Sequence, residues 1–206
     1  MIDAVTLLAF VPAALALNLT PGADMMFCLG QGLRSGRAAA VAASAGISAG
    51  SMVHVTLVGL GLGAVVSAMP GMFDVIRWVG VAYLLYLAWG ALRTGPVRAN
   101  TPAVPVRRAF RSGFLVNLTN PKVILFVLAF VPQFVRPEAG PVLAQFLVFG
   151  LILAVGGFVI NGLVGIFAGQ AGRQLTGSPL FARWLGRISA GIFTGLAVRL
   201  AIMERA

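Results

Sequence analysis

The chain is dominated by apolar runs long enough to cross a lipid bilayer. Hydrophobic residues make up 59% of its 206 residues and charged residues only 10%. A helix of about twenty apolar residues covers the roughly 30 Å hydrocarbon layer of a membrane. Runs of about this length or longer lie at about residues 4–33, 38–69, 75–92, 112–135, 142–169 and 188–203. The pattern predicts an all-α integral membrane protein with six transmembrane helices in a single transmembrane domain, residues 1–206.

The first run begins in a way that could be mistaken for a signal peptide. Ala14-Leu15-Ala16 is similar to a cleavage site. However, Asp3 stands where a signal peptide carries a basic residue, and the apolar run continues to Leu33. We therefore expect this run to be retained as a helix.

Two nearly identical phrases interrupt the first and fourth runs. They are Asn18-Leu19-Thr20-Pro21 and Asn117-Leu118-Thr119-Asn120-Pro121. A proline in a membrane helix removes one backbone donor and frees the carbonyl one turn earlier. Such groups are tolerated only inside protein or beside a watery cavity. Matching interruptions in two halves of a chain indicate a transporter's binding site.

The two phrases divide the chain into two predicted repeats of three helices each. Repeat 1 covers about residues 1–95 and repeat 2 about residues 106–206, with a polar loop at about 93–111 between them. Because three is an odd number, the second repeat enters the membrane from the opposite face. About 20 Å of helix separates each proline from the end of its run, which places both breaks at similar depths. The expected plan is a pair of inverted repeats.

The arginines set the expected orientation. The formal net charge is +10, and the basic residues lie between the apolar runs rather than along one helix face, which argues against a nucleic-acid partner. The first, third and fifth loops hold Arg34 and Arg37, then Arg93, Arg98, Arg107, Arg108 and Arg111, then Arg173, Arg183 and Arg187. The second and fourth loops hold only Arg77 and Arg136. Positive loops stay inside, so the loop at 93–111 is expected in the cytoplasm and both termini outside.

One acid and one lysine lie inside the predicted spans, each just after a break. Asp24 follows the first break, and Lys122, the only lysine, follows the second. Because a charge within the bilayer is costly, each is a functional hypothesis by default. The alternative is that they neutralise each other as a purely structural pair.

The breaks also predict binding groups. Thr20-Pro21 and Asn120-Pro121 fit an N-cap followed by proline at the first helical position. A helix N-terminus offers free N–H groups and a positive dipole end to a carboxylate. The asparagine amides either line the same cavity or satisfy the freed backbone. The candidate substrate-binding or coupling residues are Asn18, Thr20, Pro21, Gly22, Asp24, Asn117, Thr119, Asn120, Pro121 and Lys122, with His54 and Asn161 as weaker candidates.

The remaining features have structural interpretations. Trp78, Tyr83, Tyr86 and Trp89 are expected to anchor a helix at the lipid interface. The pairs Gly46/Gly50, Gly59/Gly63 and Gly165/Gly169 are typical of close helix packing and leave a homodimer plausible. One cysteine, one histidine and the lack of a nucleotide-binding loop predict no metal site, no cofactor and no ATP hydrolysis. The sequence contains no recognisable pair of nucleophile and general base, so we do not expect an enzyme.

The motifs resemble those of the LysE/RhtB family of bacterial amino-acid exporters. The resemblance spans the whole chain. It is carried by residues 18–26, Gly36-Arg37, the small-residue run with Gly46, Gly50 and His54, then 80–87, 117–122 and Pro132-Gln133-Phe134. Ala23 departs from the second proline usual in the family. The resemblance implies proton-driven efflux of an amino acid or related small metabolite across the inner membrane. It leaves the substrate open.

Two functions therefore follow from the sequence. The first is an exporter of a small zwitterion that binds between the two breaks. The second is a non-transporting membrane scaffold or assembly subunit, in which the polar residues only satisfy the kinks.

Overall fold

The computed structural model describes residues 2–68, 72–93, 104–168 and 178–202, and its regular structure there is entirely helical. The helices are α1 (Ala4–Leu19), α2 (Ala23–Arg34), α3 (Arg37–Ala68), α4 (Met72–Leu92), α5 (Val106–Leu118), α6 (Pro121–Ala129), α7 (Val142–Ile166) and α9 (Pro179–Ile202), with short 3-10 turns η1 (Val131–Phe134) and η2 (Pro137–Ala139). The all-helical prediction is confirmed for these residues.

Both predicted breaks are present. Helices α1 and α2 meet at an angle of 54°, and α5 meets the stretch from Pro121 to Phe134 at 53°. Proline causes each break, because it cannot donate to the carbonyl four residues earlier. The prediction that the first and fourth helices are interrupted is confirmed.

The second half-helix of each pair starts differently. Asn120 caps α6, its side chain accepting from the Lys122 N–H at 3.1 Å, and Pro121 is the first helical residue, as predicted. The matching prediction for Thr20 and Pro21 is wrong. The N-cap of α2 is Gly22, in an extended conformation, while the Thr20 hydroxyl donates to the Ala16 carbonyl at 2.6 Å and ends α1. The chain stays extended through Gly22, and α2 begins at Ala23.

Two helices begin earlier than hydropathy indicated. Helix α5 starts at Val106 rather than near residue 112, and α9 starts at Pro179 rather than near 188. The residues Arg107, Arg108, Arg111, Arg183 and Arg187 therefore lie on helices rather than in loops. Arginine is a good helix former whose long side chain reaches out of an apolar layer, so a helix can continue past the end of its apolar run.

Several described helices are suited to a membrane. Residues Arg37–Gly61 and Val142–Ile166 are each long and apolar enough to span it, and the two bent pairs bring the number to four if each pair is one span. In α4 the apolar stretch Val81–Leu92 is shorter. The protein is therefore a multi-pass membrane protein, while six crossings remain a prediction.

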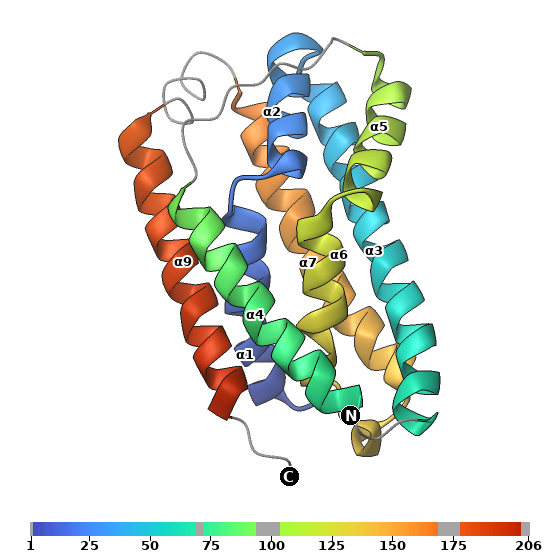
Figure 1. Ribbon diagram of the computed structural model, residues 1–206. Helices are drawn as coiled ribbons and strands as arrows, with labels where there is room; N and C mark the ends of the chain where they lie inside the picture. Colours follow the sequence, from blue (N-terminus) through green and yellow to red (C-terminus); the bar gives the residue numbers. More distant parts are fainter. Residues whose placement is uncertain (1, 69–71, 94–103, 169–177, 203–206) are drawn as a thin grey trace.

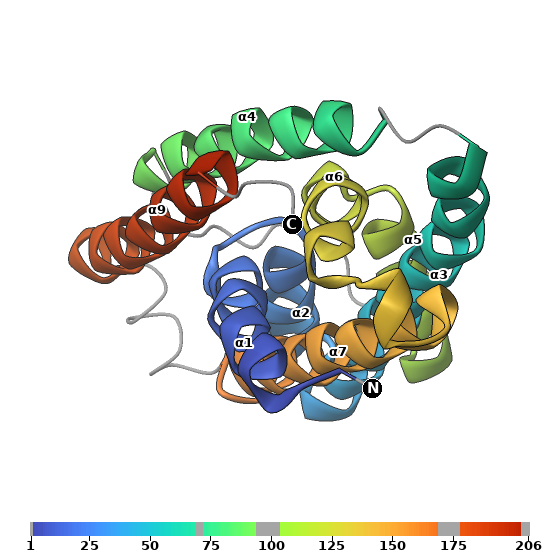
Figure 2. The same ribbon diagram turned by 90° about the horizontal axis from the view of Figure 1, so that it is seen from below.

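The helices form three layers. Helix α1 begins and helix α9 ends at one end of the bundle, and the turn between α2 and α3 lies at the other end (Figure 1). Helices α4 and α9 pack together on one side, and α3 packs against α7 and α5 on the other (Figure 2). The bent pairs lie between these sides and contact both. The interior of the bundle is therefore where the breaks are found.

Small residues allow the helices around α3 to approach closely. A Cβ added at Gly46 would collide with the backbone of Phe110 in α5, and one at Gly113 would collide with the Ala43 backbone. A Cβ at Gly165 would lie 2.5 Å from the Ala40 side chain. The predicted close packing is confirmed at Gly46 and Gly165, but within one chain, so these glycines give no support to a homodimer. The surroundings of Gly63 and Gly169 lie outside what the structure describes.

Phenylalanines fill the bundle between the breaks and the end that holds the termini. We call Phe10, Phe126, Phe130, Phe134 and Phe149 the aromatic cluster. Its ring centroids approach to 4.8 Å for Phe10 and Phe149 and for Phe126 and Phe130. Such tilted ring pairs add to the large stabilisation from burying their area. The cluster joins α1, α6 and α7 directly beside the breaks.

Candidate functional site

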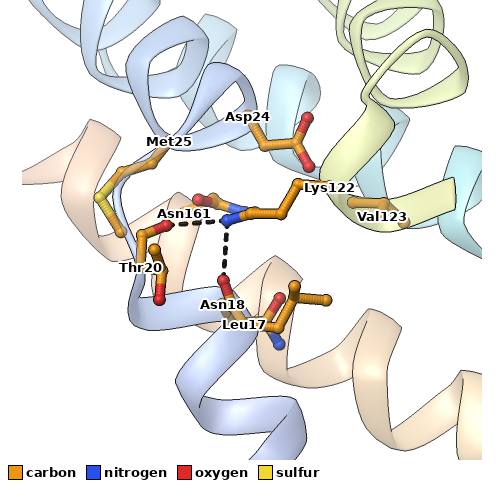
Figure 3. Close-up of a pocket in the computed structure, with 8 residues that line it drawn as sticks. All are labelled: Leu17, Asn18, Thr20, Asp24, Met25, Lys122, Val123 and Asn161. Carbon is orange, nitrogen blue, oxygen red and sulfur yellow. Dashed lines mark hydrogen bonds between the residues drawn. The ribbon is translucent and has the colours of Figure 1, made fainter. Parts of the chain in front are cut away.

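The two breaks meet around a small polar cavity. Its lining consists of Leu17, Asn18, Thr20, Asp24, Met25, Lys122, Val123 and Asn161 (Figure 3). The cavity measures about 10 Å³, which is room for about one water molecule. The lining joins side chains that are about a hundred residues apart in the sequence. The fold therefore brings together predicted site residues from both halves.

Lys122 closes the broken end of α1. Its ammonium donates to the carbonyl oxygens of Leu17 and Thr20, both at 2.8 Å (Figure 3). In an unbroken helix the Leu17 carbonyl would accept from residue 21, but Pro21 has no N–H. The C-terminal end of a helix also carries partial negative charge, which favours a cation. A lysine from the second half of the chain thus supplies hydrogen bonds to the carbonyls that the break in the first half leaves free.

At the other break, His54 lies beside the carbonyl that the proline leaves without its helical donor. Pro121 deprives the Asn117 carbonyl of its helical donor, and His54 Nε2 lies 3.2 Å from that oxygen. With Nε2 protonated, the ring donates this hydrogen bond. The Asn120 N–H also donates to the same oxygen at 3.0 Å. Each break is therefore satisfied by a titratable side chain from the opposite half of the chain.

Asp24 lies in the first turn of α2 and is 7% exposed. Its Oδ2 accepts from the Asn117 side-chain amide at 2.8 Å, and Asn117 Oδ1 in turn accepts from the Ser51 hydroxyl at 3.3 Å. The positive end of the α2 dipole favours the carboxylate. No ion pair joins Asp24 and Lys122, both of which are described, although the carboxylate interacts electrostatically with the ammonium. The two are neighbours rather than a salt bridge.

Three buried polar atoms near the breaks find no hydrogen-bond partner within the described part of the chain. They are Asp24 Oδ1, Asn161 Oδ1 and Asn120 Nδ2. Buried polar groups are nearly always paired, so unpaired ones point to a missing partner such as water or a ligand. Asp24 and Asn161 also line the cavity, and Asn161 is 3% exposed. Two residues of the cavity lining therefore each carry an acceptor oxygen without a hydrogen-bond partner.

The other predicted residues surround this centre at different distances. Asn18 lines the cavity while its amide donates to the Leu153 carbonyl of α7 at 3.1 Å. At Gly22 an added Cβ would lie 3.2 Å from Lys122 Nζ. Thr119 is exposed and donates only to carbonyls of its own helix, and Pro121 is exposed as well. These last two residues do not line the cavity.

Tyr83 was missed as a site neighbour. It was predicted to be a lipid-interface anchor, but it is 8% exposed, and its hydroxyl donates to the Lys122 carbonyl at 3.0 Å. Trp78, Tyr86 and Trp89 are more than half exposed, as anchors require. The spacing of apolar residues could have distinguished Tyr83 from the exposed aromatic residues of α4. Leu87 and Ala91 follow Tyr83 at intervals of four residues, which places the three on one face of the helix, and all three are buried.

Comparison with known proteins gives the family. The model of the LysE type translocators matches residues 15–204. The chain belongs to the LysE type translocator family. Members are transporters rather than enzymes, so the sequence resemblance and the expectation of a non-enzyme are both confirmed. No solved structure gives a significant match.

Three relatives illustrate the range of the family. An uncharacterized membrane protein of Vibrio cholerae is 32% identical over 94% of this chain and 95% of its own length. A homoserine/homoserine lactone efflux protein of Salmonella typhimurium is 36% identical over 74% of this chain and 75% of its own. A leucine efflux protein of an Enterobacter species is 29% identical over 95% of this chain and 94% of its own length. The translocator is thus similar to efflux proteins over most of its length.

Proposed function

We propose that this translocator exports an amino acid or a related small amino compound across the bacterial inner membrane, driven by the proton gradient. The observation that carries this proposal is the composition of the cavity between the breaks. It combines one cation, Lys122, with two unpaired acceptors, Asp24 Oδ1 and Asn161 Oδ1. An amino acid carries the complementary groups, a carboxylate and an ammonium.

The donors of the site suit the carboxylate of such a substrate. Lys122 has three N–H donors, of which main-chain carbonyls use two in the empty state, and its ammonium is the cation of the site that can pair with a carboxylate. A hydrogen bond between charged groups is stronger than a neutral one. Homoserine and leucine, named for two relatives, both carry a carboxylate and an ammonium, whereas homoserine lactone, also named for the first, shares only the ammonium. This agreement supports the substrate class but does not select a side chain.

The described state is closed. A cavity of about 10 Å³ holds about one water molecule and is far too small for an amino acid. Loading therefore requires the two bent pairs to separate. They lie between the α3–α7 layer and the α4–α9 layer, so a movement of one layer against the other opens the site alternately to the two faces.

The proposed architecture is six crossings in two inverted repeats. Helices α4 and α9 supply the third and sixth crossings. The equivalent helices of the two repeats pack against each other, α3 on α7 and α4 on α9, an arrangement that fits a two-fold axis within the membrane. The bend angles of 54° and 53° also match.

The arginine-rich end is assigned to the cytoplasm. Arg34 and Arg37 lie at the end of the bundle opposite the termini, and α5, with Arg107 and Arg108, begins at that same end (Figure 1). Positive-inside orientation then leaves both termini in the periplasm.

Asp24 is the proposed proton carrier. It is the only carboxylate in the cavity lining, and its Oδ1 is free to accept a proton. Protonation would remove a charge beside Lys122 and Asn117 and so change the affinity of the site for an ammonium. Uptake from the periplasm and release into the cytoplasm would couple export to the gradient.

Counterflow in proteoliposomes tests the proposal. Liposomes preloaded with one amino acid from a panel should transiently accumulate the same labelled amino acid, with homoserine and leucine in the first panel. Vesicles with a Lys122→Met variant should accumulate much less, whereas the exposed Arg136→Gln variant should match the wild type. If no panel member accumulates in vesicles that contain folded protein, the scaffold interpretation replaces export.

A further inference from the structure

Two main-chain carbonyls at the end of α1 have the form of an ammonium-binding site. The oxygens of Leu17 and Thr20 both accept from Lys122 Nζ at 2.8 Å. Within the helix, Leu17 would pair with residue 21, which is a proline, and Thr20 would pair with residue 24, which lies beyond the break. The helix itself therefore offers these two oxygens no competing donor.

The Lys122 ammonium, which the two carbonyls accept from, is the same chemical group as the ammonium of the proposed substrate. Lys122 presents a primary ammonium, with N–H groups on a nitrogen at the end of an aliphatic chain. A primary amino acid presents the same group at its α-carbon. A quaternary ammonium carries the same charge but no N–H, so it cannot replace the two hydrogen bonds. The carbonyl pair can thus distinguish ligands by their N–H groups.

The Lys122 side chain occupies space in the cavity where the substrate would bind. The side chain of Lys122 reaches across the cavity from α6 to the end of α1 (Figure 3). An added Cβ at Gly22 would lie only 3.2 Å from the ammonium, so little room remains on that side. Withdrawal of Lys122 would enlarge the cavity but would leave two carbonyls unpaired, which is unfavourable unless another donor takes its place.

We propose that the Leu17 and Thr20 carbonyls are a primary-ammonium subsite, filled by Lys122 in the empty translocator and by the ammonium of the substrate in the loaded one. This inference rests on the proposed export of amino compounds. The displaced Lys122 ammonium is then free to pair with the carboxylate of the same substrate. The empty protein is held closed by its own lysine, and loading exchanges one ammonium for another.

The wild-type protein allows a direct test, because Lys122 is its only lysine. Labelling with lysine enriched in ¹³C at Cε gives a single side-chain NMR signal, which reports on Lys122. Titration with methylammonium chloride should shift this signal in a saturable way, and tetramethylammonium chloride at the same concentrations should not. Equal responses to the two salts, or no saturable response to either, would overturn the proposal.

A variant tests the vacant site. Lys122→Met keeps an unbranched side chain that is one heavy atom shorter and leaves both carbonyls without a donor. Methylammonium should raise the Tm of this variant more than that of the wild type, and tetramethylammonium should raise neither. Tyr83→Phe serves as the matched control, since it removes a hydrogen bond to the same residue but keeps the ammonium in place. If Lys122→Met does not fold, the wild-type titration decides alone.

The result can be separated from the fate of the export proposal. If counterflow fails with every amino acid but the methylammonium shift is observed, the ammonium subsite stands and export falls. If an amino acid is exchanged in counterflow but leaves the Lys122 signal unmoved at saturation, export stands and the subsite is refuted.

Discussion

The side-chain amide of Asn117 in α5 donates to the carboxylate of Asp24 in α2 at 2.8 Å, which joins the two broken helices by a direct hydrogen bond. Asn117 is completely buried, and the residues are 93 positions apart in the sequence. One contact therefore connects the two halves of the chain at the breaks that their sequences share.

Asn117→Ala should weaken the site. The change leaves Asp24 Oδ2 buried without its donor, and such a loss costs about 1–3 kcal/mol, or roughly a 5- to 150-fold weaker substrate affinity if it is felt in binding. Asn18→Ala should have a similar effect through its contact with Leu153. Binding to purified protein measures both, with the exposed Thr119→Ala as the control. Aggregation of either variant, with normal affinity in the folded fraction, would instead identify a structural kink partner.

Asp24→Asn should separate exchange from coupling. Asparagine keeps an oxygen for the Asn117 amide but cannot titrate, so counterflow should persist while acceleration by an imposed pH gradient is lost. The measurement is uptake into vesicles with and without the gradient, and Asp3→Asn, at an exposed position, is the matched control. Concentration of substrate by Asp24→Asn vesicles under a proton gradient alone would refute the coupling role.

Tyr83→Phe should lower stability, whereas Tyr86→Phe should not. The Tyr83 hydroxyl is buried against the Lys122 carbonyl, and a typical hydrogen bond contributes about 1 kcal/mol. Tyr86 is 67% exposed on the same helix. Thermal unfolding in one detergent compares the two. Equal Tm values for the variants would mean that the hydroxyl contact contributes nothing.

Gly46→Ala should destabilise the pairing of α3 with α5. The added methyl group would meet the Phe110 backbone, which cannot rotate away, and overpacking of this kind costs about 1–3 kcal/mol. Gly61→Ala is the control on the same helix, because its Cβ meets nothing within 4 Å and alanine favours helix. Unfolding temperatures should fall for the first and hold or rise for the second. Unchanged stability of Gly46→Ala would show that the two helices are not so close.

Cysteine labelling tests the orientation. Ala99→Cys, in a loop that lies outside the described residues, should resist an impermeant thiol reagent added to intact cells, because we place that loop in the cytoplasm. Glu138→Cys, at the opposite end of the bundle, should react readily. The native Cys28 is fully buried and contributes little background. Reversed reactivity of the two variants would invert the assignment.

The breaks could be predicted because proline acts through a local rule. Pro21 and Pro121 remove a backbone donor wherever they stand in a helix, so the interruptions and the freed carbonyls follow from the sequence alone. The partners of those carbonyls could not be predicted. Lys122 and His54 reach them from the opposite half, and nothing local in a sequence reports which distant side chain fills a gap.

Other features of the fold could not be predicted from the sequence, for different physical reasons. Hydropathy records where side chains are apolar, not where hydrogen bonding begins, so the polar first turns of α5 and α9 were assigned to loops. Tyr83 was misplaced because a tyrosine suits both a lipid interface and a buried hydrogen bond, and only its neighbours decide. At Thr20 and Pro21 the sequence has the usual cap pattern, but Thr20 bonds back to the end of α1 and α2 starts only at Ala23.

The aromatic cluster has a consequence for energy conservation. An exporter that is idle for most of its life must not act as a proton wire, since every leaked proton dissipates the membrane potential that sustains the cell. The rings of Phe10, Phe126 and Phe149 are completely buried on the terminal side of Asp24 and Lys122, and they offer no hydrogen-bonding atoms along which a chain of waters could form. In the proposed proton-coupled mechanism, we expect these rings to insulate Asp24 and Lys122 from one face of the membrane while the bundle is closed.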